Sequence, residues 1–133
     1  MHANQESLRL LTELDFIRLK KLTGGDLPGE LSDSQGLVDL LPSREIPPDV
    51  VTMNSQVEIV FPATGLRQKM TLCYPADAEP GLGRVSALAP MGSALLGLRV
   101  GARAQWNMPG GEAQAAEVAA ILFQPEAAGH YTT

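Results

Sequence analysis

Three prolines in one short stretch divide this chain into two parts with different hydrophobic periods. Pro42, Pro47 and Pro48 fix φ and lack a backbone N–H, so neither a helix nor a central strand continues through them. Before this stretch the apolar residues recur at mostly helical spacing, and after it they follow the pattern of strands. We therefore predict an α+β fold with two units, residues 1–45 and residues 46–133.

The first unit begins with a helix whose two ends are marked by the sequence. Thr12 and Asp15 form a capping-box pattern at its start, and Gly24 and Gly25 end it. Residues 8–11 fit a short strand or an early helical turn, and the pattern does not separate the two.

A second helix is predicted over residues 30–41, where Leu31, Val38 and Leu41 can share one face despite the helix-weakening Gly36. The two helices would form a short antiparallel, coiled-coil-like hairpin whose apolar faces pair between chains or fold back on the second unit. At 1.5 Å per residue a ten-residue helix is about 15 Å long.

The second unit reads as an antiparallel β domain with one short helix. Strands are predicted over residues 50–53, 57–61, 67–74, 85–88, 102–107 and 113–123, and a helical turn over residues 93–98. The tail, residues 125–133, has little to bury.

Charge argues against direct contact with nucleic acid. The net charge is −5, with five basic and eight acidic residues in 1–45 and five basic and seven acidic residues in 46–133. Arg18, Lys20 and Lys21 form the one basic cluster, and they suit the last turn of a helix. Nucleic-acid binders usually present a basic face, so DNA contact is expected only through a partner.

The sequence predicts a cytoplasmic protein without a membrane segment. No apolar run approaches the roughly 18 residues that a membrane span needs. Residues 1–6 show neither the basic nor the apolar region of a signal peptide. Cys73 is the single cysteine of the 133-residue chain, so it has no partner for an intramolecular disulfide.

The search for catalytic residues finds no convincing candidate. His2 and His130 lie near the chain ends, and Cys73 falls inside a predicted strand, where a buried thiol is expected. No spacing of ligands indicates a metal or a cofactor. Asp26 and Glu30 flank the hairpin tip, where they could hold Mg²⁺ through water, but solvated loop charges are the favoured interpretation. We therefore predict a binding protein and not an enzyme.

Three segments resemble the C-terminal domain of bacterial Gre-type transcript-cleavage factors. They are residues 49–55 (DVVTMNS), residues 89–97 (APMGSALLG) and residues 109–112 (PGGE). Four stretches resemble one branch, the regulator of nucleoside diphosphate kinase (Rnk) family: residues 48–55, 89–92 and 95–101, which overlap these segments, and residues 124–129. The resemblance implies an FKBP-like β domain, a short N-terminal coiled coil, and binding to core RNA polymerase near its secondary channel in competition with Gre factors.

The resemblance also places the polymerase contact in one loop, Leu88, Ala89, Pro90, Met91 and Gly92. Gre factors commonly carry Asp-Ser before the proline, so contact here would depend on apolar burial and shape. Alternatively Pro90 and Met91 belong to the core around a helix start, which is the preferred interpretation for Leu95 and Leu96.

The hairpin is too short for transcript cleavage. A cleavage factor carries acidic residues on a long coiled coil to the polymerase active centre, which an arm of about 15 Å would not reach. We therefore predict a polymerase-binding regulator without cleavage activity, with a monomer favoured.

Two alternatives remain: direct binding to nucleoside diphosphate kinase, and an FKBP-like prolyl isomerase. The latter needs an aromatic-lined pocket, for which the chain offers Phe16, Phe61, Tyr74, Trp106, Phe123 and Tyr131.

Overall fold

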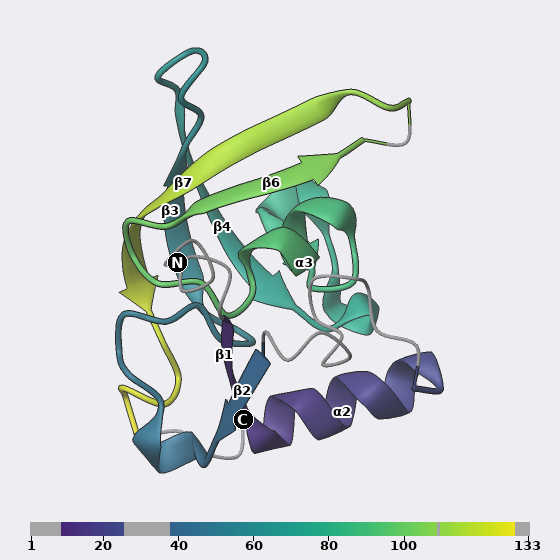
Figure 1. Ribbon diagram of the computed structural model, residues 1–133, viewed down its shortest axis with the longest axis vertical. Coiled ribbons are helices and arrows are strands. Elements are labelled where there is room, and N and C mark those ends of the chain that lie inside the picture. The colour runs from purple at the N-terminus through teal and green to yellow at the C-terminus, as the bar shows by residue number, and fades with distance from the viewer. Residues whose placement is uncertain (1–8, 26–37, 109, 130–133) are drawn as a thin grey trace, which may run out of the picture.

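A curled five-stranded sheet forms the centre of the protein (Figure 1). The computed structural model describes residues 9–25, 38–108 and 110–129. The strand order is β5-β4-β3-β7-β6, with β3 (Gln56–Val60), β4 (Arg67–Cys73), β5 (Arg84–Ser86), β6 (Arg103–Asn107) and β7 (Ala113–Phe123). The α+β class is therefore confirmed, and the FKBP-like description stays a prediction.

The sheet is not antiparallel throughout. β3 pairs antiparallel with β4 and β7, and β7 pairs antiparallel with β6, but β4 and β5 run parallel. The predicted strand over residues 50–53 is also wrong, since this segment makes a single bridge, from Val50 to Arg99. Its residues are buried all the same, so their apolar character reflects burial and not strand pairing.

The predicted second helix is wrong over the part that the structure describes. Val38–Leu41 form strand β2, which pairs parallel with β1 (Arg9–Thr12). Pairing with β1 decides between the two structures that this short apolar segment could adopt. The same pairing shows that residues 9–11 form a strand and not a helical turn. Residues 26–37, including the predicted hairpin tip, lie outside the described residues.

The first helix has the predicted boundaries. α2 (Glu13–Thr23) begins at Thr12, whose hydroxyl accepts a hydrogen bond from the Asp15 N–H at 3.0 Å. It ends at Gly24, whose φ of 70° lies in the left-handed region that favours glycine.

The N-terminal elements fold back on the β domain. Leu11 of β1 and Phe16 and Leu19 of α2 lie in the same hydrophobic core as Leu72 of β4 and Leu96. In Figure 1, α2 lies below the sheet, beside β1 and β2. Of the two arrangements left open for the first unit, the described residues therefore show packing within one chain.

The chain after β7 is anchored, contrary to the expectation that it has little to bury. The Gln124 side-chain amide donates to the carbonyl oxygens of Pro47 at 2.8 Å and Val50 at 2.7 Å. Glu126 accepts a hydrogen bond from the Thr52 hydroxyl at 2.7 Å, and Pro125 between them is buried. These bonds join the segment after β7 to residues 47–52.

Replacing Gln124 with leucine should lower the free energy of unfolding by about 2 kcal/mol, because two carbonyl acceptors lose their donor at a buried site. Urea unfolding followed by circular dichroism would measure the change. Exposed Gln68 on β4 provides the matched control, Gln68→Leu, for which a change within about 0.5 kcal/mol is expected. Equal stability of the two variants would contradict this role for Gln124.

Candidate interaction surface at the loop of residues 88–92

The loop of residues 88–92, called the contact loop below, is held by Ser86 at the end of β5. The Ser86 hydroxyl accepts from the Leu88 N–H at 3.0 Å, and the Ser86 carbonyl accepts from the Ala89 N–H at 3.1 Å. Helix α3 (Pro90–Leu95) follows, with Pro90 at its first position. It begins three residues earlier than the predicted helical turn, so the contact loop runs into the helix.

The five predicted contact residues differ in exposure. Pro90 is exposed, Leu88, Ala89 and Met91 are half-buried, and Gly92 is buried. Met91 and Leu88 pack against the edge of the core with part of their surface open to a partner. Leu95 and Leu96 are fully buried, as the core interpretation predicted.

Gly92 fixes the path of the contact loop and offers no side chain. A Cβ atom added at Gly92 would overlap the carbonyl oxygen of Ser86 and lie 2.8 Å from its carbonyl carbon. Both are backbone atoms, so no side-chain rotation would relieve the overlap. The loop and β5 can approach this closely only with glycine here.

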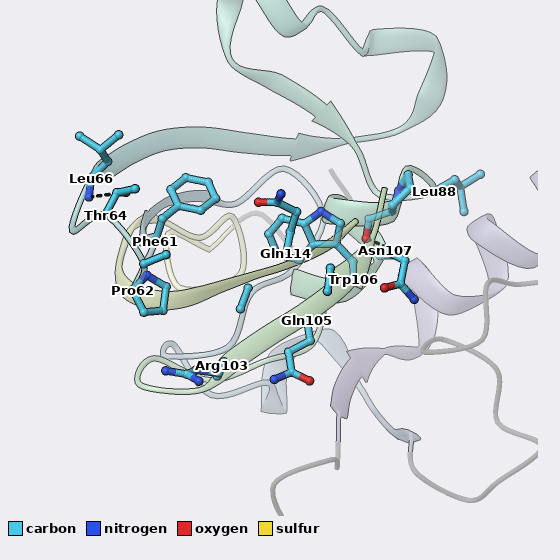
Figure 2. Close-up of a pocket in the computed structure, with 15 residues that line it drawn as sticks. Phe61, Pro62, Thr64, Leu66, Leu88, Arg103, Gln105, Trp106, Asn107 and Gln114 are labelled. Carbon is cyan, nitrogen blue, oxygen red and sulfur yellow. Dashed lines mark hydrogen bonds between the residues drawn. The ribbon is translucent and has the colours of Figure 1, made fainter. Parts of the chain in front are cut away.

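A groove of about 1130 Å³ opens beside the contact loop (Figure 2). Three parts of the chain line it: the β3–β4 turn from Phe61 to Leu66, the contact loop with α3, and β6 with the first residues of β7. Leu88, Pro90 and Ser93 belong to this lining. Two of the five predicted contact residues, Leu88 and Pro90, therefore lie in one wall of a larger concave surface.

Successive side chains of β6 point to opposite faces of the β6–β7 hairpin, so the groove-lining residues of this strand lie on both faces. Trp106 is buried and is paired with Gln114, whereas Gln105 and Asn107 are exposed. Figure 2 shows Phe61, Gln114 and Trp106 along one side of the hairpin, with Gln105 pointing to the other side. The inner part of the groove is therefore aromatic and apolar, with one amide.

The chemistry of the groove suits a partner recognised by shape. Among its described lining residues Arg103 is the one charged residue, and it lies on the exposed side of β6. The other polar groups are hydroxyls and amides. Such a surface can bury apolar side chains of a partner and satisfy a few of its backbone groups.

A buried polar cluster lies away from the groove, between α2 and the β domain. The Asp15 carboxylate accepts from the Met53 N–H at 3.3 Å and from the Tyr74 hydroxyl at 3.4 Å. Burial, with repulsion from Glu126, raises the Asp15 pKa from 3.8 to about 6, although the Met53 hydrogen bond lowers it. Burial, with the Asp15 charge, raises the Tyr74 pKa to about 12.

This cluster connects parts of the fold and is not part of the groove. It joins α2, the segment before β3 and the residue after β4, and neither Asp15 nor Tyr74 lines the groove. Cys73 is buried, and burial raises the pKa of its thiol, which disfavours the reactive thiolate. In the described parts of the chain, no group of three or more histidine, cysteine or acidic residues could hold a metal ion.

Several sequence-predicted residues lie outside the described residues: His2, Asp26, Glu30 and His130. Across residues 9–25, 38–108 and 110–129, no helix is long and apolar enough to cross a bilayer. The sequence analysis missed Ser86, and it named Phe61 and Trp106 only as available aromatic residues, without predicting that they line one groove. A serine two residues before a loop N–H is a local signal for an ST-turn, but nothing local predicts that Phe61 and Trp106 meet.

A family model described as "Transcription elongation factor, GreA/GreB, C-term" matches residues 46–123. "Regulator of nucleoside diphosphate kinase" from Escherichia coli K12 is 48% identical over 88 residues, covering 66% of this chain and 65% of that protein. "Transcription elongation factor GreA" from Geobacillus kaustophilus is 35% identical over 65 residues, covering 49% of this chain and 41% of that protein. The chain thus spans just under two thirds of the first relative's length and less than half of the second's.

The fold is also similar to that of solved structures. "Prokaryotic transcription elongation factor GreA/GreB from Nitrosomonas europaea" superposes with a TM-score of 0.68 at 33% identity, covering 87% of this chain and 98% of that one. The GreA factor homologue Gfh1 of Thermus thermophilus has a TM-score of 0.51 at 22% identity and covers 87% of this chain and 99% of that one, which shows similarity of fold alone. The contact loop and all three groove-lining parts fall inside residues 46–123.

Proposed function

The chain belongs to the GreA/GreB C-terminal family, within which it is similar to Rnk, and we propose that it is a transcription regulator that binds RNA polymerase without cleaving the transcript. The observation that carries this proposal is the contact loop, which presents exposed Pro90 and half-buried Met91 beside a groove. We expect the contact to lie at the secondary channel, as the resemblance to Gre-type factors implies.

The composition of the contact surface supports a protein partner. Leu88 and Met91 are large apolar side chains with part of their surface open, and Trp106 and Phe61 lie in the adjoining groove. Partly exposed apolar and aromatic groups around a concave surface are typical of interaction sites. The loop is also preorganised for binding, because the Ser86 hydrogen bond and the close approach of Gly92 to the Ser86 backbone fix its conformation.

The size of the N-terminal segment supports regulation without transcript cleavage. Helix α2 has 11 residues and so is about 16 Å long, and it ends at the left-handed Gly24. Strand β2 returns the chain to β1, and Phe16 and Leu19 of α2 are buried in the core. The described residues thus form a docked segment, whereas cleavage requires a long projecting arm. Incubation with a backtracked transcription complex should leave the RNA intact, under conditions in which a Gre factor shortens it.

Replacing Met91 with aspartate should weaken binding to core RNA polymerase by at least tenfold, which is about 1.4 kcal/mol of binding free energy. A carboxylate would have to lose water where the wild-type protein buries an apolar side chain. Fluorescence anisotropy of the labelled protein, titrated with core polymerase, would measure the dissociation constant, and a Gre factor should displace the bound protein.

The matched control is Met108→Asp, which makes the same change at an exposed methionine outside residues 88–92. This variant should bind as the wild type does. Absence of wild-type binding at micromolar polymerase would refute the proposal. Equal effects of the two variants would instead show that the contact does not lie at residues 88–92.

The 48% identical relative named as a regulator of nucleoside diphosphate kinase favours a second candidate function. In this candidate the chain binds that kinase directly. A pull-down with purified kinase, in the presence and absence of core polymerase, separates the two functions. Retention of the kinase without polymerase, lost in Met91→Asp, would place the kinase on the contact loop.

A further inference from the structure

We infer that Arg9 is a positioning residue for the contact loop: its guanidinium group holds the carboxyl end of α3 and so fixes residues 88–92 at the helix start. The inference rests on the proposed function, because it names the residue that orders the same surface. Arg9 lies in β1, far along the chain from the loop that it would position.

The guanidinium group supplies donors that the end of α3 needs. Arg9 Nη1 lies 2.8 Å from the carbonyl oxygens of Ala94 and Leu96 and 3.4 Å from that of Ser93. The last carbonyl groups of a helix have no partners within the helix, and a cation there also complements the helix dipole. Residues 92–98 are buried, so these carbonyls depend on donors from the protein.

Ser93 connects this end of the helix to the contact loop. Its N–H donates to the Ala89 carbonyl at 2.8 Å, and its hydroxyl donates to the Pro90 carbonyl at 3.2 Å. α3 has only six residues, so displacing its carboxyl end also moves its first turn. The bonds from Arg9 to α3, and from Ser93 to Ala89 and Pro90, thus form one continuous network.

A second contact keeps β1 in place against α3. The Leu10 N–H donates to the Gly97 carbonyl at 3.1 Å. Gly97 has a φ of 86°, and an added Cβ would lie 3.0 Å from the Arg9 Cβ. The close backbone approach at Gly97 brings the Arg9 side chain within reach of α3.

The test compares Arg9→Met, which removes the donors and keeps an unbranched side chain, with Arg9→Lys, which keeps the charge and fewer donors. Trp106 is the single tryptophan, is 7% exposed and lies on β6, against which α3 packs. In Arg9→Met we expect acrylamide quenching of Trp106 fluorescence to rise at least twofold and polymerase affinity to fall at least tenfold. Arg9→Lys should give intermediate values of both.

Arg67→Met is the matched control, because Arg67 makes an exposed ion pair with Glu58 and has no role in the contact loop. It removes the same charge and should leave both measurements unchanged. A lower melting temperature of Arg9→Met with wild-type quenching and affinity in the folded protein would overturn the inference, because a merely stabilising contact gives that result. If Arg9→Met fails to fold, the test rests on Arg9→Lys. Wild-type quenching and wild-type polymerase affinity in Arg9→Lys would then overturn the inference.

The experiment separates this inference from the proposed function. If the wild-type protein does not bind polymerase, the proposed function fails, and Trp106 quenching in the free protein still tests the positioning role. If the wild type binds and Arg9→Met changes neither quenching nor affinity, the positioning role fails and the proposed function stands.

Discussion

Replacing Asp15 with asparagine is expected to stabilise the folded protein by about 3 kcal/mol at pH 7.5. Burial and the nearby Glu126 raise the Asp15 pKa from 3.8 to about 6, so the folded state binds a proton more tightly than the unfolded state does. Stability is therefore lost as pH rises from about 4 to about 6, and the rise in pKa corresponds to about 3 kcal/mol. Asparagine is neutral at every pH and can still accept the Met53 hydrogen bond.

Urea unfolding of the wild type and of Asp15→Asn between pH 4 and pH 8 would measure this effect. The difference in unfolding free energy between them should be small near pH 4, rise with a midpoint below pH 6, and level off above it. Arg18, Glu126 and Tyr74 are the charged and titratable groups that influence Asp15, and all three remain in both proteins.

Asp39→Asn on β2 is the control, because Asp39 is an exposed carboxylate. Its difference from the wild type should stay within about 0.5 kcal/mol over the whole pH range. If Asp15→Asn were less stable than the wild type at pH 7.5, the ionised Asp15 side chain would stabilise the fold, which contradicts the prediction. A difference that does not vary with pH would contradict the raised pKa.

The sequence could predict the elements whose signals are local. Thr12 and Gly24 mark the ends of α2 because capping depends on residues within one turn. Strands β4, β6 and β7 carry apolar patterns bounded by turn residues, and their observed ranges differ from the predicted ones by at most one residue at either end. The family resemblance supplied the contact loop, which periodicity alone would have read as the start of a helix.

The elements that the sequence analysis missed depend on contacts between distant residues. Val38–Leu41 fit a helix or a strand, and the parallel partner β1 decides between them. The anchoring of the chain after β7 was missed because the acceptors of Gln124, Pro47 and Val50, lie more than 70 residues earlier. Arg9 and Ala94 are 85 residues apart, so no local pattern predicts their hydrogen bond.

Gly92→Ala should lower the free energy of unfolding by about 3 kcal/mol and abolish measurable binding to polymerase. Alanine favours helices over glycine by about 1 kcal/mol, so propensity alone predicts a stabilised α3. The overlap of a Cβ with the Ser86 carbonyl outweighs this gain, because both the oxygen and the carbonyl carbon are backbone atoms of β5. The contact loop would have to move away from β5, which displaces Pro90 and Met91 together.

Gly81→Ala provides the control, because an added Cβ at Gly81 meets nothing within 4 Å. This variant should keep wild-type stability within about 1 kcal/mol and wild-type affinity. Urea unfolding and polymerase titration of both variants measure the two effects separately. If Gly92→Ala is destabilised yet binds polymerase as the wild type does, the close approach at Gly92 supports the fold alone, and the geometry of the contact loop does not set the affinity. Loss of binding in protein that remains folded at low temperature ties the backbone path at Gly92 to partner recognition.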